Sequence, residues 1–489
     1  MSQFFDIVIV GAGSAGCALA NRLSTDPALR VGLLEAGGDD SREAIRVPHQ
    51  YFSLWGTDVD WQYVSTAQPG TRGRTHVMPR GRVMGGTSSL NGMVYLRGAA
   101  SDYDAWASAG CTGWGWSDVV PSFEAMEAWL RPAVLEPHNP VSVAMRDAAV
   151  EFGLPLNPDF DSGTLDGSGW NKSTILDGER HNANRAFLEP IAERENLRII
   201  PETRVSRVMF EGNRVTGLEV IQNGRIDTIA AGEVILAAGA FESPRILMLS
   251  GIGPADQLID HGIVPRHDLP VGNNLIDHLL IGVVYTSRRP IPAQHAFTTE
   301  GCAFVRSTPD RMDCDIEISF AKEPHFAPEA HDGLPRYTII PGITKPKSRG
   351  TVRLTGADLD ALLAIDPNYF ADPADMAYMI RAVRVSREIG KQAALEDWNA
   401  GEFFPGIDIE SDEEIDAYVR KDVSTWFHPA GTCRMGVGED AVVDPVLRVR
   451  GLDGLRVADA SIMPDIVGVN TNAASTMIGW HAAELFLRG

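Results

Sequence analysis

The chain begins with an apolar stretch that runs directly into a glycine-rich turn. Residues 6–10, Asp-Ile-Val-Ile-Val, suit a parallel strand that is buried on both faces. Gly11, Gly13 and Gly16 follow in the spacing GxGxxG. In this spacing the first glycine permits a tight turn, the second lets a pyrophosphate approach the backbone, and the third lets a helix pack on the strand. The pattern predicts a dinucleotide-binding turn, with the phosphates on free N–H groups at the helix N-terminus.

The residues after this turn strengthen the prediction. A helical stretch with apolar residues at 15, 19, 20 and 23 leads to a second apolar strand, Val31–Leu34. Glu35 ends that strand, about 20 residues after the turn, where an acidic side chain binds a ribose hydroxyl. Because Glu35 would repel a 2′-phosphate, FAD or NAD is favoured over NADP. The alternative is a glycine turn in a βαβ unit that binds no nucleotide.

Composition excludes several classes of partner. The 489 residues suffice for two or three domain-sized units, and a net charge of -22 argues against nucleic acid or an anionic membrane surface. The five cysteines are scattered and form no zinc-type cluster, so we expect reduced thiols, a cytoplasmic protein and no metal. Residues 1–5 lead directly into the first strand, so we expect no signal peptide. We also expect no membrane span, since no apolar run approaches about eighteen residues.

Further along, irregular and regular segments alternate. Residues 36–98 read as a long irregular stretch, a type that is usually functional or covering. Within it, residues 79–92 carry glycine pairs beside small hydroxyl residues, which suits either close contact with a flat ring or phosphate, or a flexible surface loop. Residues 197–230 alternate as short strands, and 233–240 read as a second buried strand that we expect to join the first sheet. Ser243 and Pro244 are expected to begin a helix after it.

The middle of the chain has a different pattern. Alternating segments at 280–287, 315–320, 337–343 and Thr351–Leu354 predict an antiparallel sheet, with a helix over about 375–389 beside it. The predicted fold class is therefore α/β: a Rossmann-like domain with a second domain built on an antiparallel sheet flanked by helices.

Three segments near the C-terminus carry the remaining chemistry: Trp-Phe-His-Pro-Ala-Gly-Thr from 426, the stretch 454–464, and Val-Asn-Thr-Asn-Ala-Ala from 469. With the N-terminal GxGxxG, the Gly-Gly-Thr-Ser-Ser-Leu-Asn loop from 85 and Gly-Ala-Phe-Glu-Ser-Pro from 239, they stand in an order that resembles the glucose-methanol-choline (GMC) family of flavoprotein oxidoreductases. The resemblance covers essentially the whole chain.

The resemblance implies FAD and the removal of a hydride from an alcohol carbon, while a base takes the hydroxyl proton. His428 matches the family's invariant histidine, and imidazole suits a base because its pKa lies near working pH. Asn470 matches a position that is histidine in some members and asparagine in others. Its amide can orient the substrate oxygen but cannot act as a base. We therefore expect activity to fall on the acid side with an apparent pKa of about 6–7.5.

The resemblance also implies the cofactor contacts. Gly86 and Asn91 are expected along the flavin, Val205 near adenine, and Asp459 by the pyrophosphate or ribityl chain. Leu90 stands where some members link FAD through histidine, so we expect noncovalent FAD. The full expected FAD-binding set is Gly11, Gly13, Ser14, Ala15, Gly16, Glu35, Ala36, Arg82, Met84, Gly85, Gly86, Ser89, Asn91, Gly92, Met93, Val94, Val205, Ala238, Gly239, Asp459, Ala460, Asn470, Thr471 and Asn472.

By the same resemblance, residues 1–195, 196–277 and 425–489 are assigned to an FAD-binding domain, with covering and flavin-contact loops in 36–98. Residues 278–424 are assigned to a substrate-binding domain. Trp426 and Phe427 are expected to wall the substrate pocket beside His428 and Asn470, although plain core packing would explain either aromatic residue.

The expected substrate is a small primary alcohol on a ring, of aryl, furan or pyridine type. A choline-like substrate, for which Glu317 could supply a carboxylate, an aliphatic or polyol alcohol, a hydroxynitrile lyase reaction and a nonenzymatic flavin protein are the alternatives. Electrons would pass to oxygen, a quinone or a carrier, and the oligomeric state is left open.

Overall fold

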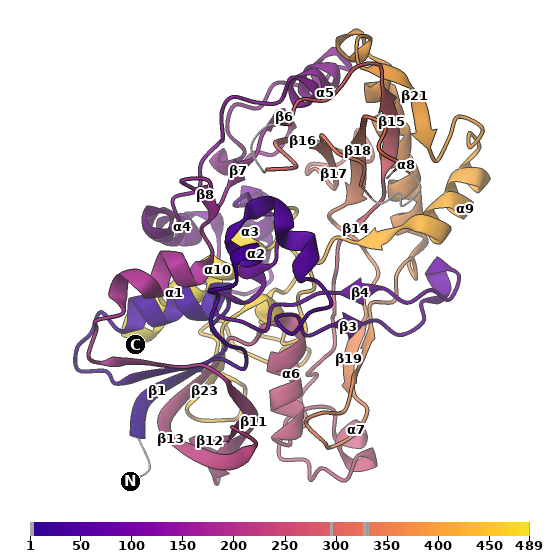
Figure 1. Ribbon diagram of the computed structural model, residues 1–489. Coiled ribbons are helices and arrows are strands. Elements are labelled where there is room, and N and C mark those ends of the chain that lie inside the picture. The colour runs from indigo at the N-terminus through magenta and orange to yellow at the C-terminus, as the bar shows by residue number, and fades with distance from the viewer. Residues whose placement is uncertain (1–3, 294–296, 326–329, 331, 489) are drawn as a thin grey trace.

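The computed structural model describes residues 4–293, 297–325, 330 and 332–488. Two β-sheets organise it, one low and one high in Figure 1, with helices packed beside each. The predicted mixed α/β class is confirmed.

The lower sheet has strand order β10-β2-β1-β13-β12-β11, with β23 beside β13. Its strands are β1 (Phe4–Val10), β2 (Val31–Leu34), β10 (Leu197–Ile200), β11 (Thr203–Glu211), β12 (Arg214–Gln222), β13 (Arg225–Leu236) and β23 (Leu455–Val457). β10, β2, β1, β13 and β23 run parallel, and residues 7–10 of β1 are buried, as expected for a strand covered on both faces.

The strand expected at 233–240 does join the first sheet, but its bounds are wrong, because β13 begins at Arg225 and ends at Leu236. The first part of β13 pairs antiparallel with β12, and the second part pairs parallel with β1 and β23. One strand thus connects a three-stranded meander to the parallel nucleotide-binding type of sheet.

Helices from both ends of the chain cover this sheet. α1 (Ser14–Leu23) packs against α10 (Asn472–Arg488), so the first and last helices lie side by side (Figure 1). Gly479 permits this approach, since a Cβ there would lie 2.1 Å from the carbonyl oxygen of Ala15. α3 (Ala100–Ser108) and α4 (Trp116–Leu130) pack nearby.

The helix after β13 begins earlier than predicted. α6 spans Gly239–Leu249, so Pro244 lies inside it, and the start expected at Ser243 is wrong. A proline in this position leaves the carbonyl of Ala240 without its helical N–H partner. Thr432 supplies the missing donor, because its hydroxyl bonds to that carbonyl at 2.7 Å.

The upper sheet is antiparallel and has the order β21-β15-β18-β17-β16-β6, with β14 beside β18 and β22. Its strands are β6 (Gly167–Trp170), β14 (Leu279–Leu280), β15 (Val283–Ser287), β16 (Gly301–Val305), β17 (Ile316–Ala321), β18 (Arg336–Ile343), β21 (Asn399–Phe404) and β22 (Ser424–Thr425). β6 comes from the segment 1–195, so this sheet contains residues from outside 278–424.

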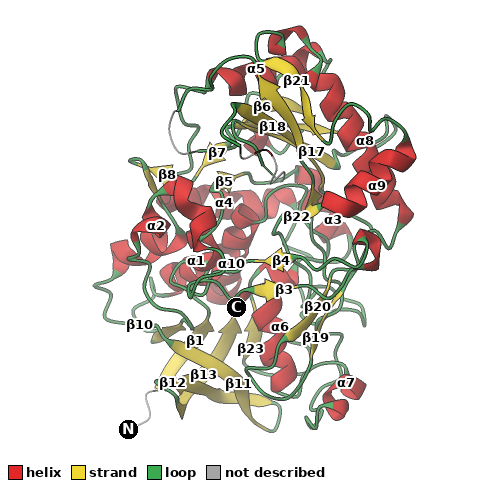
Figure 2. Ribbon diagram, turned by 45° about the vertical axis from the view of Figure 1, so that its right-hand side comes forward, coloured by secondary structure: helices red, strands yellow, loops and turns green. Residues whose placement is uncertain are grey.

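Helices cover one face of the upper sheet. α5 (Pro140–Glu151) and α8 (Pro373–Gly390) pack on its strands, and α9 (Asp412–Asp422) packs on α8 (Figure 2). The helix predicted at 375–389 is confirmed; Asp372 caps it by accepting the N–H of Ala374. The opposite face of the sheet is turned toward the lower half of the molecule.

The strand expected at Thr351–Leu354 forms, but its place in the antiparallel sheet is wrong. It is β19, whose one partner strand in the described part of the chain is β20 (Leu363–Asp366), and it packs against α6. Its N-terminal residues are held away from the upper sheet, because Gly350 and Leu275 exchange backbone hydrogen bonds and Val352 N–H bonds to Gly272.

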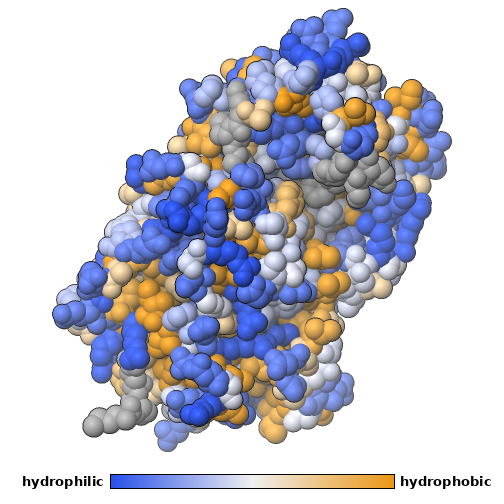
Figure 3. All heavy atoms as spheres, viewed as in Figure 1, coloured by the Kyte–Doolittle hydropathy of each residue, from blue (hydrophilic) through white to orange (hydrophobic). Residues whose placement is uncertain are grey.

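Short elements complete the described chain. The stretch 36–98 contains β3 (Tyr63–Val64), β4 (Val77–Met78) and β5 (Val94–Tyr95) besides α2 (Glu43–Arg46). The others are β7 (Lys172–Ser173), β8 (Ile175–Leu176), β9 (Glu179–Arg180) and α7 (Ala255–Asp260). No helix among the described residues is long and apolar enough to cross a bilayer, and the face in Figure 3 intersperses hydrophilic with hydrophobic residues.

Candidate functional site

A cavity of about 290 Å³ lies between the two sheets and is lined by both. Its lower part, which we call the glycine-turn end, contains the turn after β1 and Glu35. Its upper part, the histidine end, contains His428 and Asn470. The lining includes most of the predicted residues: Gly11, Gly13, Ser14, Ala15, Glu35, Ala36, Gly86, Asn91, Gly92, Met93, Val94, Val205, Ala238, Gly239, Trp426, Phe427, His428, Asp459, Ala460, Asn470, Thr471 and Asn472.

The glycine turn has the tight geometry that the motif predicts. Gly11 has φ +101°, and a Cβ there would lie 2.6 Å from the Ala237 carbonyl oxygen. Gly86, from the loop after β4, reaches across to the turn, where its own Cβ would lie 2.6 Å from Gly13 Cα. Side chains at Gly11 and Gly86 would collide with neighbouring backbone, so the turn and the loop can pack this closely only as glycines.

Glu35 binds the backbone of the turn. Its two oxygens accept the N–H groups of Ala12 at 2.9 Å and Gly37 at 2.8 Å. Burial raises the pKa of this carboxyl to about 7. The carboxyl group also lines the cavity, where its remaining lone pairs suit a ribose hydroxyl.

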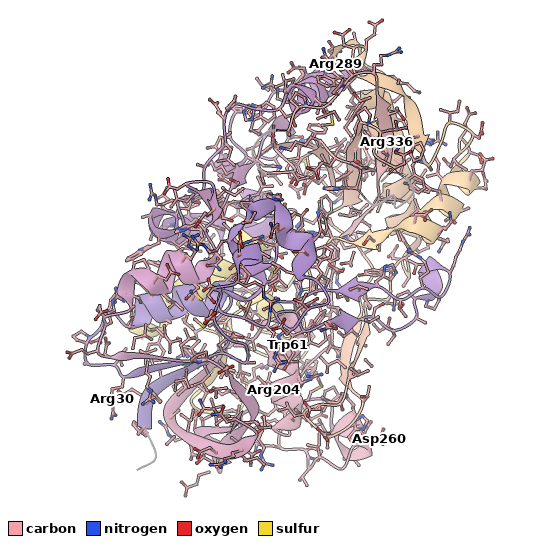
Figure 4. The ribbon with its side chains drawn as sticks, in the orientation of Figure 1. Arg30, Trp61, Arg204, Asp260, Arg289 and Arg336 are labelled. Atoms are coloured by element: carbon pink, nitrogen blue, oxygen red, sulfur yellow. The ribbon has the colours of Figure 1, made fainter. Side chains whose placement is uncertain are left out.

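Sequence reasoning missed an aromatic group at the glycine-turn end. The guanidinium groups of Arg204 and Arg82 both lie over the Trp61 ring, at 5.2 and 5.1 Å from its centroid. Figure 4 labels Trp61 and Arg204, which lie close together. Tyr63 stacks beside it and donates a hydrogen bond to Glu242. Among these, Trp61, Tyr63, Arg204 and Glu242 line the cavity, and they suit a planar heterocycle.

The N-terminus of α6 faces the cavity and is held by one carboxylate. Asp459 accepts the N–H of Gly239 at 2.8 Å and the hydroxyl of Ser243. Gly239 lines the cavity, and a Cβ on it would meet no atom within 4 Å. Asp459 therefore positions a second helix N-terminus toward the phosphate region.

The loop expected along the flavin is fixed from behind by Arg180, which sequence reasoning did not identify. Its guanidinium donates to the carbonyls of Ser88 and Asn91 and to the Asn91 side chain. Gly92 lines the cavity, and no atom lies within 4 Å of where its Cβ would be. A flat ring could therefore approach the loop closely at Gly92.

Five predicted contact residues lie outside the cavity lining: Gly16, Arg82, Met84, Gly85 and Ser89. They support residues that do line it. A Cβ on Gly16 would lie 1.9 Å from the Gly11 carbonyl oxygen, so this glycine lets α1 pack on the turn. Ser89 donates to the Met84 carbonyl at 2.8 Å, which closes the loop around Gly85.

At the histidine end, His428 contacts both predicted and unpredicted partners. Asn470 Nδ2 lies 3.2 Å from its Nε2, so the structure brings the two predicted catalytic residues together. Its Nδ1 lies 3.0 Å from Nδ1 of His278, and its backbone N–H donates to Asp277 at 2.8 Å. Arg80 donates to the carbonyl of the neighbouring Phe427.

The expected apparent pKa of 6–7.5 for His428 disagrees with this environment. Burial disfavours the imidazolium, and the nearby Arg80 guanidinium repels its charge further. The pKa of His428 is therefore held well below 6.5 in the protein alone. The side chain stays neutral, which is the form that accepts a proton.

Aromatic side chains surround the rest of the histidine end. Trp55 lies 4.8 Å from both Phe52 and Phe427, measured between ring centroids, and Tyr51 stands beside Phe52. Trp426 stacks at 6.0 Å from His428 and covers Gly342, where a Cβ would lie 2.2 Å from its ring. Hydroxyl groups of Thr299 and Ser319 add polar positions.

The carboxylates that line the cavity lie away from the aromatic side chains of the histidine end. Among the described lining residues, the carboxylates are Glu35, Glu242 and Asp459, which bond to the glycine turn, Tyr63 and the start of α6. Glu317 is buried behind Ser319 and accepts its hydroxyl at 2.7 Å. Burial raises the pKa of Glu317 to about 7.

The arrangement fits FAD. Two backbone walls bare of side chains, a buried ribose-type carboxylate and open space beside Gly92 and Gly239 match the parts of a flavin dinucleotide. Asn470 Oδ1 is buried without a hydrogen-bond partner among the described residues, so it is available to a bound polar group.

Comparisons with known proteins agree with this assignment. Two family models described as GMC oxidoreductase match residues 5–280 and 346–479. An alcohol dehydrogenase [acceptor] of Pseudomonas putida is 38% identical over 99% of this chain and 96% of its own, and the mitochondrial choline dehydrogenase of Homo sapiens is 39% identical over 98% and 89%. The crystal structure of pyridoxine 4-oxidase from Mesorbium loti superposes with a TM-score of 0.95 at 38% identity, covering 99% of both chains.

Proposed function

Since the chain belongs to the GMC oxidoreductase family, and is an FAD-dependent oxidoreductase acting on CH–OH donors, we propose that it oxidises a small primary alcohol borne on a ring. The proposed substrates are hydroxymethyl compounds of aryl, furan or pyridine type, and the product is the aldehyde. The aromatic wall of Phe52, Trp55, Trp426 and Phe427 around His428 carries this proposal, because flat rings pack well against such walls.

The similarity to pyridoxine 4-oxidase supports a ring-borne substrate, since pyridoxine is a pyridine that carries hydroxymethyl groups. The hydroxyls of Thr299 and Ser319 offer polar contacts for substituents on such a ring. This supports the pyridine type among the three.

In the proposed reaction, His428 is the base. Its Nε2 accepts the hydroxyl proton of the substrate, and the Asn470 amide orients the substrate oxygen beside it. Bound FAD supplies the hydride acceptor. Gly13, Gly86 and the N-terminus of α6 would hold its pyrophosphate, Glu35 its ribose, and the loop at Asn91 and Gly92 its ring. The aromatic wall excludes water from the reacting groups.

A choline-like substrate is the second candidate, because several similar proteins are choline dehydrogenases. A quaternary ammonium group needs an aromatic cage or a carboxylate near it. The cavity offers the aromatic residues, but Glu317 lies behind Ser319 and outside the lining. This placement favours a neutral ring over a cation.

Anaerobic mixing with a panel of alcohols tests the proposal. The panel contains benzyl, furfuryl and pyridyl alcohols, choline and an aliphatic alcohol, and bleaching of the flavin band is recorded. We expect ring alcohols to bleach the flavin at lower concentration than choline. Faster bleaching by choline would overturn the ring proposal, and cyanide release from a cyanohydrin without bleaching would indicate a lyase.

The electron acceptor is proposed to be oxygen, a quinone or a carrier. Reoxidation of the reduced enzyme is followed with air and, separately, with a quinone-like dye. A rate with air close to the turnover rate assigns an oxidase, and reoxidation by the dye alone assigns a dehydrogenase.

FAD is proposed to bind noncovalently, because Leu90 offers no nucleophile to the flavin. Acid precipitation is expected to release all the FAD into the supernatant. Yellow colour that stays in the washed pellet would contradict this.

The five cysteines support the proposal of a reducing, cytoplasmic environment, since all are buried free thiols.

A further inference from the structure

The segment just before β14 runs antiparallel to the segment that carries His428. Ile276 and Ala430 exchange backbone hydrogen bonds, Leu279 pairs with Thr425, and Trp426 N–H bonds to the His278 carbonyl. Asp277 and His278 are therefore held directly opposite Phe427 and His428. Neither residue is among those expected to touch substrate or FAD, and neither lines the cavity.

Asp277 fixes the backbone of His428. One carboxylate oxygen accepts the His428 N–H at 2.8 Å, and the other accepts the hydroxyls of Tyr369 and Thr425. The Thr425 hydroxyl also accepts the N–H of Phe427 at 2.7 Å. These bonds hold Phe427 at φ +65°, a conformation that costs energy for a bulky side chain and that persists only where neighbouring groups determine it.

His278 fixes the side chain of His428. The two Nδ1 atoms are 3.0 Å apart and the rings are nearly perpendicular, so one hydrogen lies between the two nitrogens. That hydrogen belongs either to His428 or to His278. The choice decides which nitrogen of His428 keeps the lone pair that a base needs.

The contact with Asn470 assigns the hydrogen to His428. Asn470 presents its NH₂ group to Nε2 of His428, and an amide nitrogen can only donate, so Nε2 is unprotonated. A neutral imidazole carries one N–H, so the hydrogen of His428 lies on its Nδ1, and Nδ1 of His278 presents a lone pair to it.

We infer that His278 is a positioning residue, which accepts the Nδ1–H of His428 and so directs the lone pair of Nε2 toward the substrate hydroxyl. The inference rests on the proposed role of His428 as base. In the reaction the O–H bond of the alcohol breaks, its proton joins Nε2, and the resulting imidazolium keeps its Nδ1–H bond to neutral His278. His278 therefore stabilises the charge without receiving a proton.

His278 is suited to remain neutral throughout. It is fully buried, and burial together with the nearby charge of Lys345 lowers its pKa to about 3. A neutral imidazole accepts at one nitrogen and donates at the other, which a carboxylate or amine at this place could not do.

Neutron diffraction from crystals of the FAD-loaded protein, exchanged into D₂O, tests the assignment directly. We expect deuterium on Nδ1 of His428 and Nε2 of His278, and none on Nε2 of His428. Deuterium on Nε2 of His428 would overturn the inference. The map does not depend on the substrate, so it separates a failure here from a failure of the ring-alcohol proposal.

A pair of variants tests the function of the contact. His278→Asn keeps an oxygen that can accept the Nδ1–H, whereas His278→Leu does not. We expect His278→Leu to slow anaerobic flavin reduction about 10–100-fold, and His278→Asn to recover most of the rate. The control is His481→Leu, which removes a buried imidazole bonded to Ser122 and Gly113. Equal rates for the Leu and Asn variants would contradict a role as acceptor, and a loss of the same size in His481→Leu would reduce the effect to general destabilisation.

Discussion

The two ends of the cavity recognise their partners by different means. The glycine-turn end is built from backbone: Gly13 and Gly86 approach within contact distance, and Glu35 binds N–H groups of the turn. The histidine end is built from side chains contributed by distant segments, such as His278 and His428, which are 150 residues apart. Backbone recognition tolerates no added atoms, whereas side-chain recognition depends on the identity and protonation of each group.

The largest difference is expected for His428→Ala at the histidine end. Loss of a positioned base should lower turnover about 10²–10⁴-fold. FAD content should stay near one per chain, because Glu35 and the glycine turn lie at the other end of the cavity. Turnover and flavin absorbance are measured on the same preparation, and an active His428→Ala enzyme would assign the base to another residue.

The opposite outcome is expected for Gly16→Ala at the glycine-turn end. The new Cβ would lie 1.9 Å from the Gly11 carbonyl oxygen, so α1 or the turn must shift. Overpacking of this kind costs about 1–3 kcal/mol or more, and we expect poor FAD retention with a lowered melting temperature. The matched control is Gly38→Ala, where a Cβ meets no atom within 4 Å. Full FAD content in Gly16→Ala would contradict the backbone account.

Glu35→Gln tests the glycine-turn end through the pH dependence of the free energy of unfolding. Burial raises the pKa of Glu35 to about 7, above the usual 4.5, so the FAD-free folded protein holds a proton that the unfolded chain releases. The stability from this group is present below pH 4.5 and is lost as the pH rises through 7, by up to about 3 kcal/mol. In the Glu35→Gln variant this loss should be absent. Urea unfolding of both proteins between pH 4.5 and 7 measures it, and parallel curves would show that Glu35 does not titrate in this range.

A smaller effect is expected for Asn470→Ala. It removes an orienting hydrogen bond and leaves the base in place, so turnover should fall about tenfold. Asn470→His should retain measurable activity, as the family resemblance implies. If Asn470→Ala were inactive while His428→Ala was active, the roles of base and orienting group would be exchanged.

The smallest expected effect concerns the pH at which kcat/KM falls on the acid side of its profile, which we call the acid limb. Because burial and the Arg80 charge hold the pKa of His428 well below 6.5, neutral His428 persists as the pH falls. The limb in kcat/KM should therefore lie below pH 6.5 and should vanish in His428→Ala. A limb at 6–7.5 would show that bound FAD restores an ordinary imidazole, since kcat/KM reports the substrate-free enzyme.

The sequence predicts more of the glycine-turn end of the cavity than of the histidine end, because backbone sites are local in sequence and side-chain sites are not. Local spacing identifies Gly11, Gly13, Glu35 and the buried strand β1, because a turn and its strand are contiguous. His428 and Asn470 come from the family resemblance. The surrounding residues Asp277, His278, Arg80 and Tyr369 carry no local signal, since each reaches the site only through contacts between segments that are far apart in the chain.

Two wrong predictions, the start of α6 and the pairing of Thr351–Leu354, also arise from contacts between distant segments. Pro244 indicated a helix start by a local rule, but Thr432, 192 residues from Ala240, supplies the donor that lets the helix begin at Gly239. Thr351–Leu354 has a correct strand pattern but pairs with β20, because the backbone at Gly272 and Leu275 holds it there. The local sequence pattern determines whether a helix or a strand forms. Contacts with distant residues determine where that helix or strand packs and at which residues it begins and ends.

The parallel pairing of β1, β13 and β23 also sets an order of assembly during synthesis. A ribosome releases β1 first and β23 near the end, and at about 5–20 residues per second the interval is roughly 20–90 s. During that time the glycine turn exists as sequence, but α10 and the Asp459 loop that complete its surroundings do not. We therefore expect cofactor capture to follow translation of β23 and α10, because their segments complete the surroundings of the glycine turn.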